Sequence, residues 1–310
     1  MLTGSNLDNM KILLAYDGSE SADLAIEDLQ QAGLPDHSEA LIVVVAEVWL
    51  TPPPALTSET VKLQPEEQAE IEAQEKLDLC EPESPMVSDS EQLAAHAAAM
   101  VKQRFPSWQV QTLVRCGSPA GELLQVADHS ESDLIVVGSR GRTTLGRLIL
   151  GSVSQKLVSE ARCSVRVGRG RTQESTRVQL VIGVDGSRGA DLAVHAVANR
   201  QWPPETQVRL VTSTAPFSEY WPSITVTAEN LQSMQQRAEA QLVSAGLKVS
   251  TLIDKVEPKT LLVNEAETLG ADCIFLGARG QTFLDRILLG SVSTAVSVRA
   301  PCSVEVVRGA

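Results

Sequence analysis

The sequence predicts an α/β protein built from two tandem domains, each an open five-stranded parallel sheet with helices on both faces. Three observations predict this class. Short β-branched runs alternate with amphipathic segments, which is the pattern of β-α-β units. The apolar residues, 43% of the 310-residue chain, are mainly Leu, Val, Ile and Ala, a mix that suits helices packed on a parallel sheet. The whole pattern also occurs twice along the chain.

The internal repeat is visible in three pairs of segments. Both copies keep glycine and Asp-Gly-Ser positions while the residues between them change. The chain is therefore a tandem duplication of one structural unit. The corresponding segments are 11–29 with 179–197, 117–141 with 256–280, and 149–169 with 288–308.

The first copy is longer because it contains a Pro- and Glu-rich insertion at about 51–90. This insertion is either a lid over a site or a solvated excursion, and its 66–79 portion could form an acidic helix. The polar, glycine-bearing segment after the first copy reads as a linker. We predict a first domain at 1–169, a linker at 170–177 and a second domain at 178–310.

Each copy is expected to form five strands separated by helices. In the first copy the strands are predicted near 11–16, 41–47, 109–115, 133–138 and 164–168. The helices of that copy are predicted near 20–31, 91–104, 119–130 and 152–161. In the second copy the strands are predicted near 179–184, 207–213, 248–253, 271–277 and 303–307, with helices between them.

Composition and charge disfavour several function classes. A net charge of −13 and an aromatic content of 3% disfavour binding to nucleic acid. Five cysteines without a CxxC spacing argue against a disulfide framework or a zinc site and fit a reducing compartment. No apolar run reaches the roughly 18 residues of a membrane span, so we expect a cytoplasmic protein without a membrane partner.

A glycine-rich stretch follows the fourth predicted strand of each copy. The stretches are GSRGRTTLGRLILGS at 138–152 and GARGQTFLDRILLGS at 277–291, with the same glycine spacing. In parallel sheets, ligands bind at the carboxyl edge of the strands, where these stretches begin. The apolar spacer is expected to fold back, so that Gly141 and Gly151 come together at one phosphate.

Two interpretations of these stretches remain open. In the first, the glycines allow close backbone approach, and the helix that begins at Ser152 offers its N–H groups, its dipole and the Ser152 and Ser154 hydroxyls to an anion. In the second, the glycines only form turns and Ser152 only caps its helix. The doubled pattern beside arginines favours the first.

Asp17 and Asp185 end the first strand of each copy, within AYDGS and GVDGS. A carboxylate at this edge could accept hydrogen bonds from a ribose hydroxyl. It could equally form an Asx turn before the next helix, and the sequence does not choose between the two.

Other phosphate chemistry is not supported. The chain has no GxxxxGK[ST], no GxGxxG after the first strand, and no acidic pair of the kind that a phosphorelay receiver needs. Its four histidines have no evident nucleophile partner. We therefore expect a nucleotide-binding protein. The alternatives are a weak ATPase or phosphotransfer enzyme, and a partner-binding structural protein with empty nucleotide sites.

These motifs resemble the universal stress protein family over nearly the whole chain. The resemblance rests on the doubled glycine pattern, on the DGS after each first strand, and on RCSVRVGR and PCSVEVVR as final strands. It implies a fold like that of the adenine nucleotide alpha hydrolases, with strand order 3-2-1-4-5 in each domain. It further implies a stress-response or signalling role and binding of ATP (or AMP or ADP), with Mg²⁺ held mainly by the phosphates.

Carried over by position, the resemblance implies a matching set of binding residues in each copy. Asp17 would meet the ribose, the backbone at Val45 would meet adenine, and the glycine stretch would surround the triphosphate. The first-copy stretch residues are Gly138, Ser139, Arg140, Gly141, Gly151, Ser152, Val153 and Ser154. The second-copy set is Asp185, Ser213, Gly277, Ala278, Arg279, Gly280, Gly290, Ser291, Val292 and Ser293.

The second copy departs from the first at three places. Gly117 becomes Val256, Val45 becomes Ser213 and Gly146 becomes Asp285, which favours the first copy as the ATP site. The resemblance also implies that the final strands pair within the chain as a pseudo-dimer, and it leaves a homodimer and an unknown protein partner open. Cys163 and Cys302 precede those strands and are expected to pack in the core rather than to act in redox chemistry.

Overall fold

The computed structural model describes residues 9–47, 85–141, 150–170, 177–215, 228–280 and 289–309. The first half contains strands β1 (Met10–Ala15), β2 (Ser38–Glu47), β3 (Gln109–Gly117), β4 (Leu134–Gly138) and β5 (Ser164–Gly168). Its helices are α1 (Glu20–Asp28), the short 3-10 helix η1 (Leu29–Gln31), α3 (Pro85–Arg104), α4 (Pro119–His129) and α5 (Ser152–Glu160).

The second half repeats this order of elements. Its strands are β6 (Gln179–Gly183), β7 (Gln207–Ser213), β8 (Lys248–Asp254), β9 (Cys273–Gly277) and β10 (Ser303–Val307). Its helices are α6 (Arg188–Ala198), α7 (Ala228–Ser244), α8 (Pro258–Leu269) and α9 (Ser291–Arg299).

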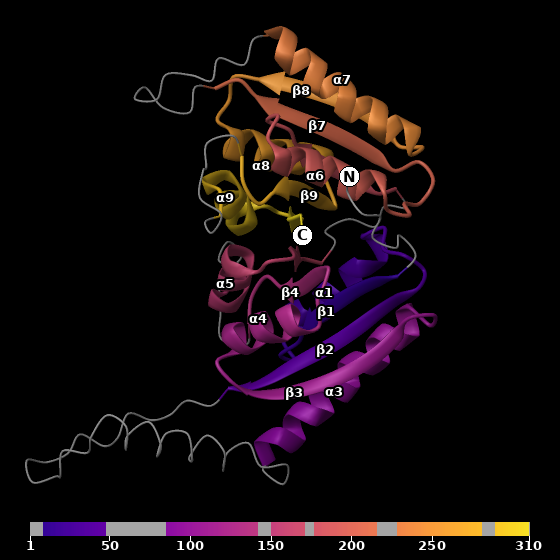
Figure 1. The fold of residues 1–310 in the computed structure, drawn as a ribbon, viewed down its shortest axis with the longest axis vertical. Coiled ribbons are helices and arrows are strands. Elements are labelled where there is room, and N and C mark those ends of the chain that lie inside the picture. The colour runs from indigo at the N-terminus through magenta and orange to yellow at the C-terminus, as the bar shows by residue number, and fades with distance from the viewer. Residues whose placement is uncertain are drawn as a thin grey trace, which may run out of the picture.

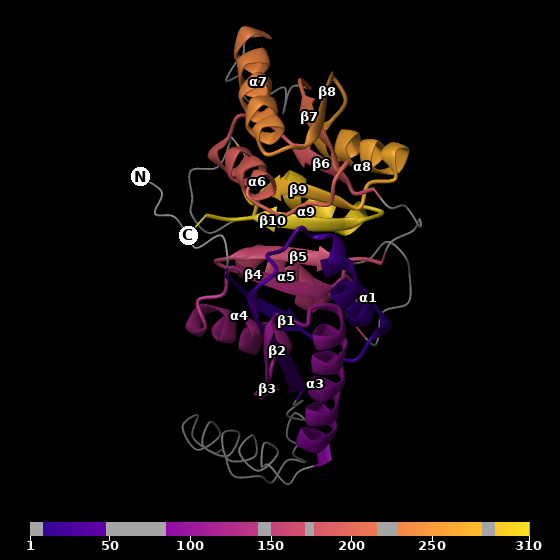
Figure 2. The ribbon, with the colours of Figure 1, turned by 90° about the vertical axis from the view of Figure 1, so that its right-hand side faces the viewer.

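All ten described strands form one continuous sheet with the order β3-β2-β1-β4-β5-β10-β9-β6-β7-β8. Pairing is parallel within each half, and each half has the expected order 3-2-1-4-5. The halves meet where β5 and β10 pair antiparallel, in the middle of the molecule (Figures 1 and 2). The expected pairing of the two final strands within one chain is therefore present.

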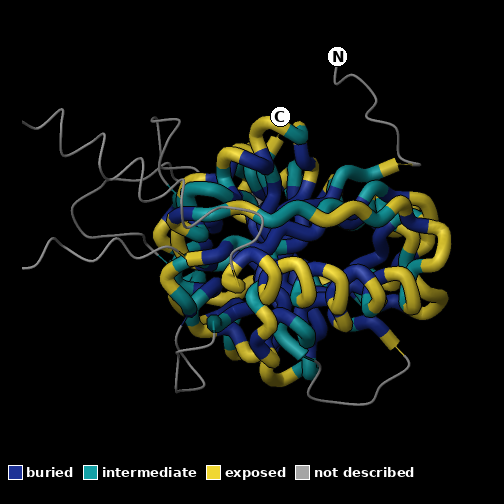
Figure 3. Tube along the Cα trace, turned by 90° about the horizontal axis from the view of Figure 1, so that it is seen from below, coloured by how far each residue is buried: buried dark blue, intermediate teal, exposed yellow. Residues whose placement is uncertain are grey.

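Helices cover both faces of the sheet, as expected. The helices α4, α5, α8 and α9 lie on one side, and α1, α3, α6 and α7 lie on the other (Figure 1). The core on the first side is continuous across both halves, because Val165 and Val304 belong to one buried cluster with Leu157 and Val296. On the other side each half has its own cluster. Buried chain segments run through the interior, and the outer turns of the helices are exposed (Figure 3).

Element boundaries differ from the sequence expectations mainly at two elements. β2 begins at Ser38 rather than near residue 41, and α3 begins at Pro85 rather than near residue 91. The early start of α3 follows from Pro at a helix start, where its fixed φ and missing N–H are tolerated. The expected acidic helix at 66–79 and most of the proposed linker lie outside the described residues, so the domain boundaries stay predictions. None of the helices in the described ranges is long and apolar enough to cross a membrane.

Candidate nucleotide site

Each glycine-rich stretch joins the carboxyl end of a buried strand to the N-terminus of a helix. β4 ends at Gly138 and α5 begins at Ser152, with Gly151 as its N-cap in an extended conformation. Gly151 provides no side-chain cap, and the first N–H of α5 bonded to the cap is that of Gln155. The N–H groups of the three residues before Gln155 have no acceptor within their own helix. They and the helix dipole form an N-terminus suited to an anion.

The second half has the same arrangement. β9 ends at Gly277, and α9 begins at Ser291 with Gly290 as its N-cap, again without a side-chain cap. The Thr294 N–H donates to the Gly290 carbonyl oxygen at 3.0 Å, in the way that Gln155 bonds Gly151. By contrast, α6 begins with a side-chain cap, because Ser187 Oγ accepts from the Ala190 N–H at 3.2 Å.

The two ends of each stretch are brought together, as the sequence predicts. Gly151 N donates to the Ser139 carbonyl oxygen at 2.9 Å, and a Cβ at Gly151 would lie 3.6 Å from the Gly141 nitrogen. In the second half, Gly290 N donates to the Ala278 carbonyl oxygen at 2.8 Å. The intervening residues 142–149 and 281–288 lie outside the described residues, whereas Leu150 at the end of the first spacer is buried.

Buried serines hold the loops to the helices. Ser154 Oγ donates to the Gly138 carbonyl oxygen at 2.7 Å, and Ser293 Oγ donates to the Gly277 carbonyl oxygen at 2.7 Å. Both serines are almost fully buried. The Ser154 hydroxyl, which the sequence assigned to an anion together with that of Ser152, therefore donates its proton to the protein backbone. What these residues present to an anion is the backbone of the first helical turn.

Of the two interpretations that the sequence left open for Asp17 and Asp185, the Asx turn is present in both halves, and the ribose contact stays a prediction. One oxygen of each forms an Asx turn, since the Ser19 N–H donates to Asp17 Oδ1 at 3.0 Å and the Ser187 N–H to Asp185 Oδ1 at 2.9 Å. The other oxygen lies against the glycine loop. A Cβ at Gly141 would be 3.2 Å from Asp17 Oδ2, and one at Gly280 would be 2.6 Å from Asp185 Oδ2.

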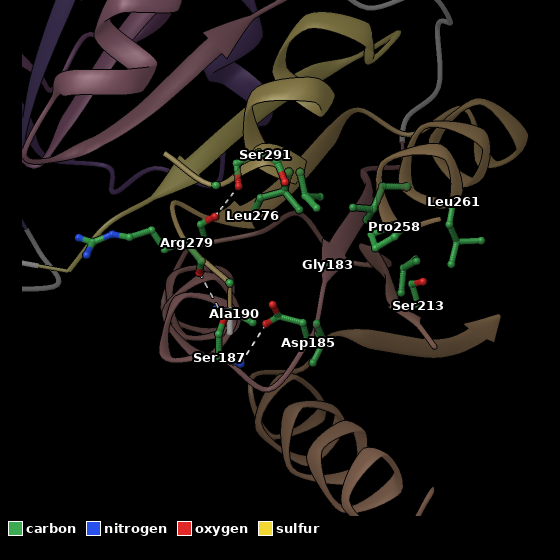
Figure 4. A pocket seen from close by; sticks show the side chains of 18 of the residues that line it. Gly183, Asp185, Ser187, Ala190, Ser213, Pro258, Leu261, Leu276, Arg279 and Ser291 are labelled. Carbon is green, nitrogen blue, oxygen red and sulfur yellow. Dashed lines mark hydrogen bonds between the residues drawn. The ribbon is translucent and has the colours of Figure 1, made fainter. Parts of the chain in front are cut away.

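In the second half a cavity of about 200 Å³ opens between these elements (Figure 4). All second-copy residues predicted to bind nucleotide line it except Ala278, which is buried in the core. Its polar lining includes Asp185 and the first residues of α9, and its apolar lining includes Val211, Leu261 and Leu276. The cavity is larger than the ~150 Å³ that holds a benzene ring in a protein core, so a planar base can fit.

The arginines of the two stretches are positioned through their backbones. Ser21 Oγ donates to the Arg140 carbonyl oxygen at 2.5 Å and accepts from the Arg140 N–H at 3.0 Å. Ser187 Oγ donates to the Arg279 carbonyl oxygen at 3.3 Å. Figure 4 shows the Arg279 side chain extending away from Asp185, Ser213 and the other labelled residues. Arg279 therefore lines the cavity mainly with its main chain.

Val45 and Ser213 occupy corresponding places at the ends of β2 and β7. Ser213 lines the cavity, and its Oγ donates to the Val256 carbonyl oxygen at 2.6 Å. Val45 is half-buried and packs against the continuous core. Gly117, which corresponds to Val256, has φ of +142°, a conformation that a β-branched residue rarely adopts, so the two loops differ in backbone path.

Several lining residues were missed from the sequence. Gly183, Ala190, Pro258 and Leu261 line the cavity but belong to no phosphate motif. Pro258 and Leu261 begin α8 at the end of the loop after β8, a place that the strand order alone could have indicated. Among the described residues, no group of three or more His, Cys, Asp or Glu could hold a metal ion.

Of the cysteines before the final strands, Cys302 is buried in the core and Cys163 is partly buried and packs against it. Burial raises the pKa of the Cys163 thiol to about 11 and that of the Cys302 thiol to about 12. Both thiols are therefore protonated near neutral pH and are poor nucleophiles. This agrees with the expected packing role.

The fold and the two loops define a tandem α/β protein with a helix N-terminus that has no side-chain cap at the end of the glycine-rich loop in each half. The model of the universal stress protein family matches residues 9–169 and 178–308, and the chain belongs to that family as a tandem-domain member. A universal stress protein of Mycolicibacterium smegmatis is 31% identical over 212 residues, which are 64% of this chain and 69% of that protein.

A solved structure that covers almost the whole chain agrees with this assignment of the fold. A universal stress protein from Archaeoglobus fulgidus matches with a TM-score of 0.63 and 21% identity, and the match covers 98% of this chain and 99% of that protein. For a universal stress protein solved in complex with cAMP, the match covers 42% of this chain and 95% of that protein, at 20% identity and a TM-score of 0.31.

Proposed function

We propose that this chain is a cytoplasmic regulator that binds an adenine nucleotide, with ATP (or AMP or ADP) held at the glycine-rich loops. The observation that carries the proposal is the cavity of the second half. It joins an uncapped helix N-terminus, a carboxylate and an apolar wall in one space. These are the three kinds of surface that phosphate, ribose and base require.

Each part of the nucleotide has a suitable partner. The phosphates would lie at the N–H groups of Ser291, Val292 and Ser293, where the helix dipole favours negative charge. Asp185 Oδ2, which lies beside Gly280, would accept a hydrogen bond from a ribose hydroxyl. The base would lie against the apolar wall that contains Leu261.

The first half would hold a second nucleotide in the same way. Like the second half, it has a glycine N-cap, a buried serine that donates to the carbonyl oxygen at the end of the strand, and an Asx turn. Mg²⁺ would be held mainly by the phosphate oxygens in either half, because Mg²⁺ commonly binds through substrate phosphates and few protein carboxylates. Binding would alter how the chain engages a protein partner.

The sharpest test places a negative charge where the phosphates would lie. Ser291 is exposed at the first position of α9, where an Asp is favourable to the helix itself. We expect Ser291→Asp to keep the unfolding temperature of the ligand-free chain but to abolish the shift that ATP–Mg²⁺ produces at the second site. Ser152→Asp makes the same test in the first half.

Ser291→Asn and Ser152→Asn are the matched controls, since they have the same shape without the charge. They should keep the ATP-dependent shift. The same samples are extracted by heat, and the released nucleotide is identified by chromatography. The proposal fails if the native chain releases no nucleotide and shows no shift with ATP–Mg²⁺, or if the doubly Asp-substituted chain keeps the shift.

A further inference from the structure

The contact between β5 and β10 is built about a local two-fold axis. Corresponding residues make corresponding contacts across it. The Arg169 N–H donates to Ser303 Oγ at 2.9 Å, and the Arg308 N–H donates to Ser164 Oγ at 3.2 Å. The carbonyl oxygens that accept from the guanidinium groups are those of Cys302 and Ser297 for Arg169, and those of Cys163 and Val158 for Arg308.

At the centre of this contact the symmetry is broken by charge. The antiparallel register places Arg166 opposite Glu305, and these two residues occupy corresponding positions of the two copies. Each position on the axis therefore faces its own counterpart. Arg166 Nη1 donates to Glu305 Oε2 at 3.2 Å. The exposed fractions of the two side chains are 0% and 1%.

One further charge from each half completes the centre. Arg166 Nε donates to Asp28 Oδ2 at 2.6 Å, and Arg200 Nη1 donates to Glu305 Oε2 at 2.9 Å. The positions that correspond to Asp28 and Arg200 are Ala196 and Ala32, which carry no charge. Charges therefore alternate through the contact, from Asp28 to Arg166 to Glu305 to Arg200. We name these four residues the central charge row.

The row is electrostatically consistent despite its burial. Burial by itself raises the pKa of Glu305, but the neighbouring Arg200 and Arg166 guanidinium groups together hold that pKa below its ordinary value. Arg166 Nη2 is buried and has no hydrogen-bond partner among the described residues. A buried ion pair with such an uncompensated atom is weak evidence for stability and is better explained by specificity.

Like pairing of the same edges would be unfavourable. If two first halves met in this register, Arg166 would face a second Arg166 on the axis. If two second halves met, Glu305 would face a second Glu305. Either arrangement buries two like charges side by side at the axis, each held only by the Asp28 or Arg200 of its own half, and loses the hydrogen bond that joins the halves. The outer contacts, in contrast, would be retained, because they obey the two-fold symmetry.

We propose that the Arg166–Glu305 pair determines which edge strands can pair, so that β5 pairs with β10 and neither strand pairs with a second copy of itself. The edge of each half accepts only the edge of the opposite half. The contact therefore forms within one chain, or reciprocally between two chains, but not between two first halves or two second halves. The partner that this surface fits is the other half of the same sequence.

The test begins with the full chain carrying a protease site between residues 170 and 177. The folded chain is cleaved, unfolded in urea and refolded by dilution, and the masses of the complexes are measured by native mass spectrometry. We expect complexes of one first half with one second half to exceed like pairs by more than about tenfold, a ratio that corresponds to about 1.4 kcal/mol.

The matched control removes the charges of the row together, as D28N/R166M/R200M/E305Q. Its cleaved halves are expected to form like and mixed pairs in random proportion. The proposal is overturned if native halves form like pairs as readily as mixed ones, if they form no mixed pairs, or if the neutral control still forms mixed pairs alone.

A second measurement uses the uncleaved chain. Glu305→Arg places a positive charge opposite Arg166 and beside Arg200 within one contact. We expect this chain to unfold at a lower urea concentration than the neutral control. Equal midpoints would show that like charges cost nothing at this place and would overturn the proposal.

Discussion

The two halves share the phosphate end of their candidate sites and differ in the walls around it. At the phosphate end, glycine N-caps, buried serines and Asx turns have the same geometry in both. On the wall, the position of Leu261 in the second half is occupied by Glu122 in the first. Glu122 is held by Arg115, with Arg115 Nε 3.2 Å from Glu122 Oε2. The two halves therefore share the residues that position the loop backbone and differ in the side chain that would face the base.

A second difference lies under the loops, where α1 and α6 begin. Ser21 in the first half bonds both backbone groups of Arg140, whereas the corresponding Gly189 packs directly on the backbone of Gly277 and Arg279. The described cavity lies in the second half, the copy that the sequence departures disfavoured as the ATP site. We therefore expect that placing the residue of one half at the corresponding position of the other will change stability or nucleotide binding.

The largest effect is expected for Gly189→Ser, which gives the second half the residue native to the first. A Cβ at this position would overlap the Arg279 carbonyl oxygen, which is fixed backbone. We expect the chain to lose about 2 kcal/mol of unfolding free energy, in the range of overpacked sites. Urea unfolding measures the change.

Gly121→Ser is the control for this prediction. Gly121 also lies in the first turn of a helix, but its nearest neighbour to a Cβ is 3.9 Å away, in ordinary contact. This substitution should leave the unfolding midpoint nearly unchanged. If both substitutions cost the same, the close packing of Gly189 is not the cause.

The second effect concerns nucleotide affinity and rests on the proposed function. Leu261→Glu places a carboxylate in the apolar wall, where it would be desolvated and would repel the phosphates. We expect about tenfold weaker binding at the second site, or about 1.4 kcal/mol. Calorimetry with ATP–Mg²⁺ on a chain that also carries Ser152→Asp reports this site alone.

The reverse exchange, Glu122→Leu, sharpens the same comparison in a chain that carries Ser291→Asp. It should strengthen binding at the first site by several-fold, since it removes a partly buried acid from the position that corresponds to Leu261. Leu261→Met, which keeps an apolar side chain of similar volume, is the control and should bind as the native chain does. Unchanged affinity in both exchanges would mean that α4 and α8 do not face the base.

The sequence predicted the fold well because its signals were local and doubled. Buried strands such as β4 and β9 are continuous apolar runs that end at glycine, so their ends and the loops after them could be placed. The approach of Gly151 to Gly141 was also expected, from the apolar spacer between them. These features depend on chain periodicity and on glycine, which single sequences display directly.

What the sequence could not provide depends on contacts between distant elements. The Ser154 hydroxyl was assigned to an anion, but its partner is a carbonyl at the end of β4. Leu261 carries no motif and matters only because α8 packs beside β9 and α9. The opposition of Arg166 and Glu305 required the register of β5 and β10, which residue types alone do not set.

The smallest effect is expected for Ser21→Gly, the exchange opposite to Gly189→Ser. It creates no overlap and removes two hydrogen bonds between the Ser21 hydroxyl and the Arg140 backbone. We expect a loss of about 1 kcal/mol of unfolding free energy. Ser130→Gly, which removes a serine at the C-terminal end of α4 away from the loops, is the comparison for the general cost of a new glycine.

Because Arg140 adjoins Gly141, Ser21→Gly should also weaken ATP–Mg²⁺ binding at the first site by a few-fold while Ser130→Gly does not. Equal binding in the two variants would show that Ser21 holds the helix start but not the loop.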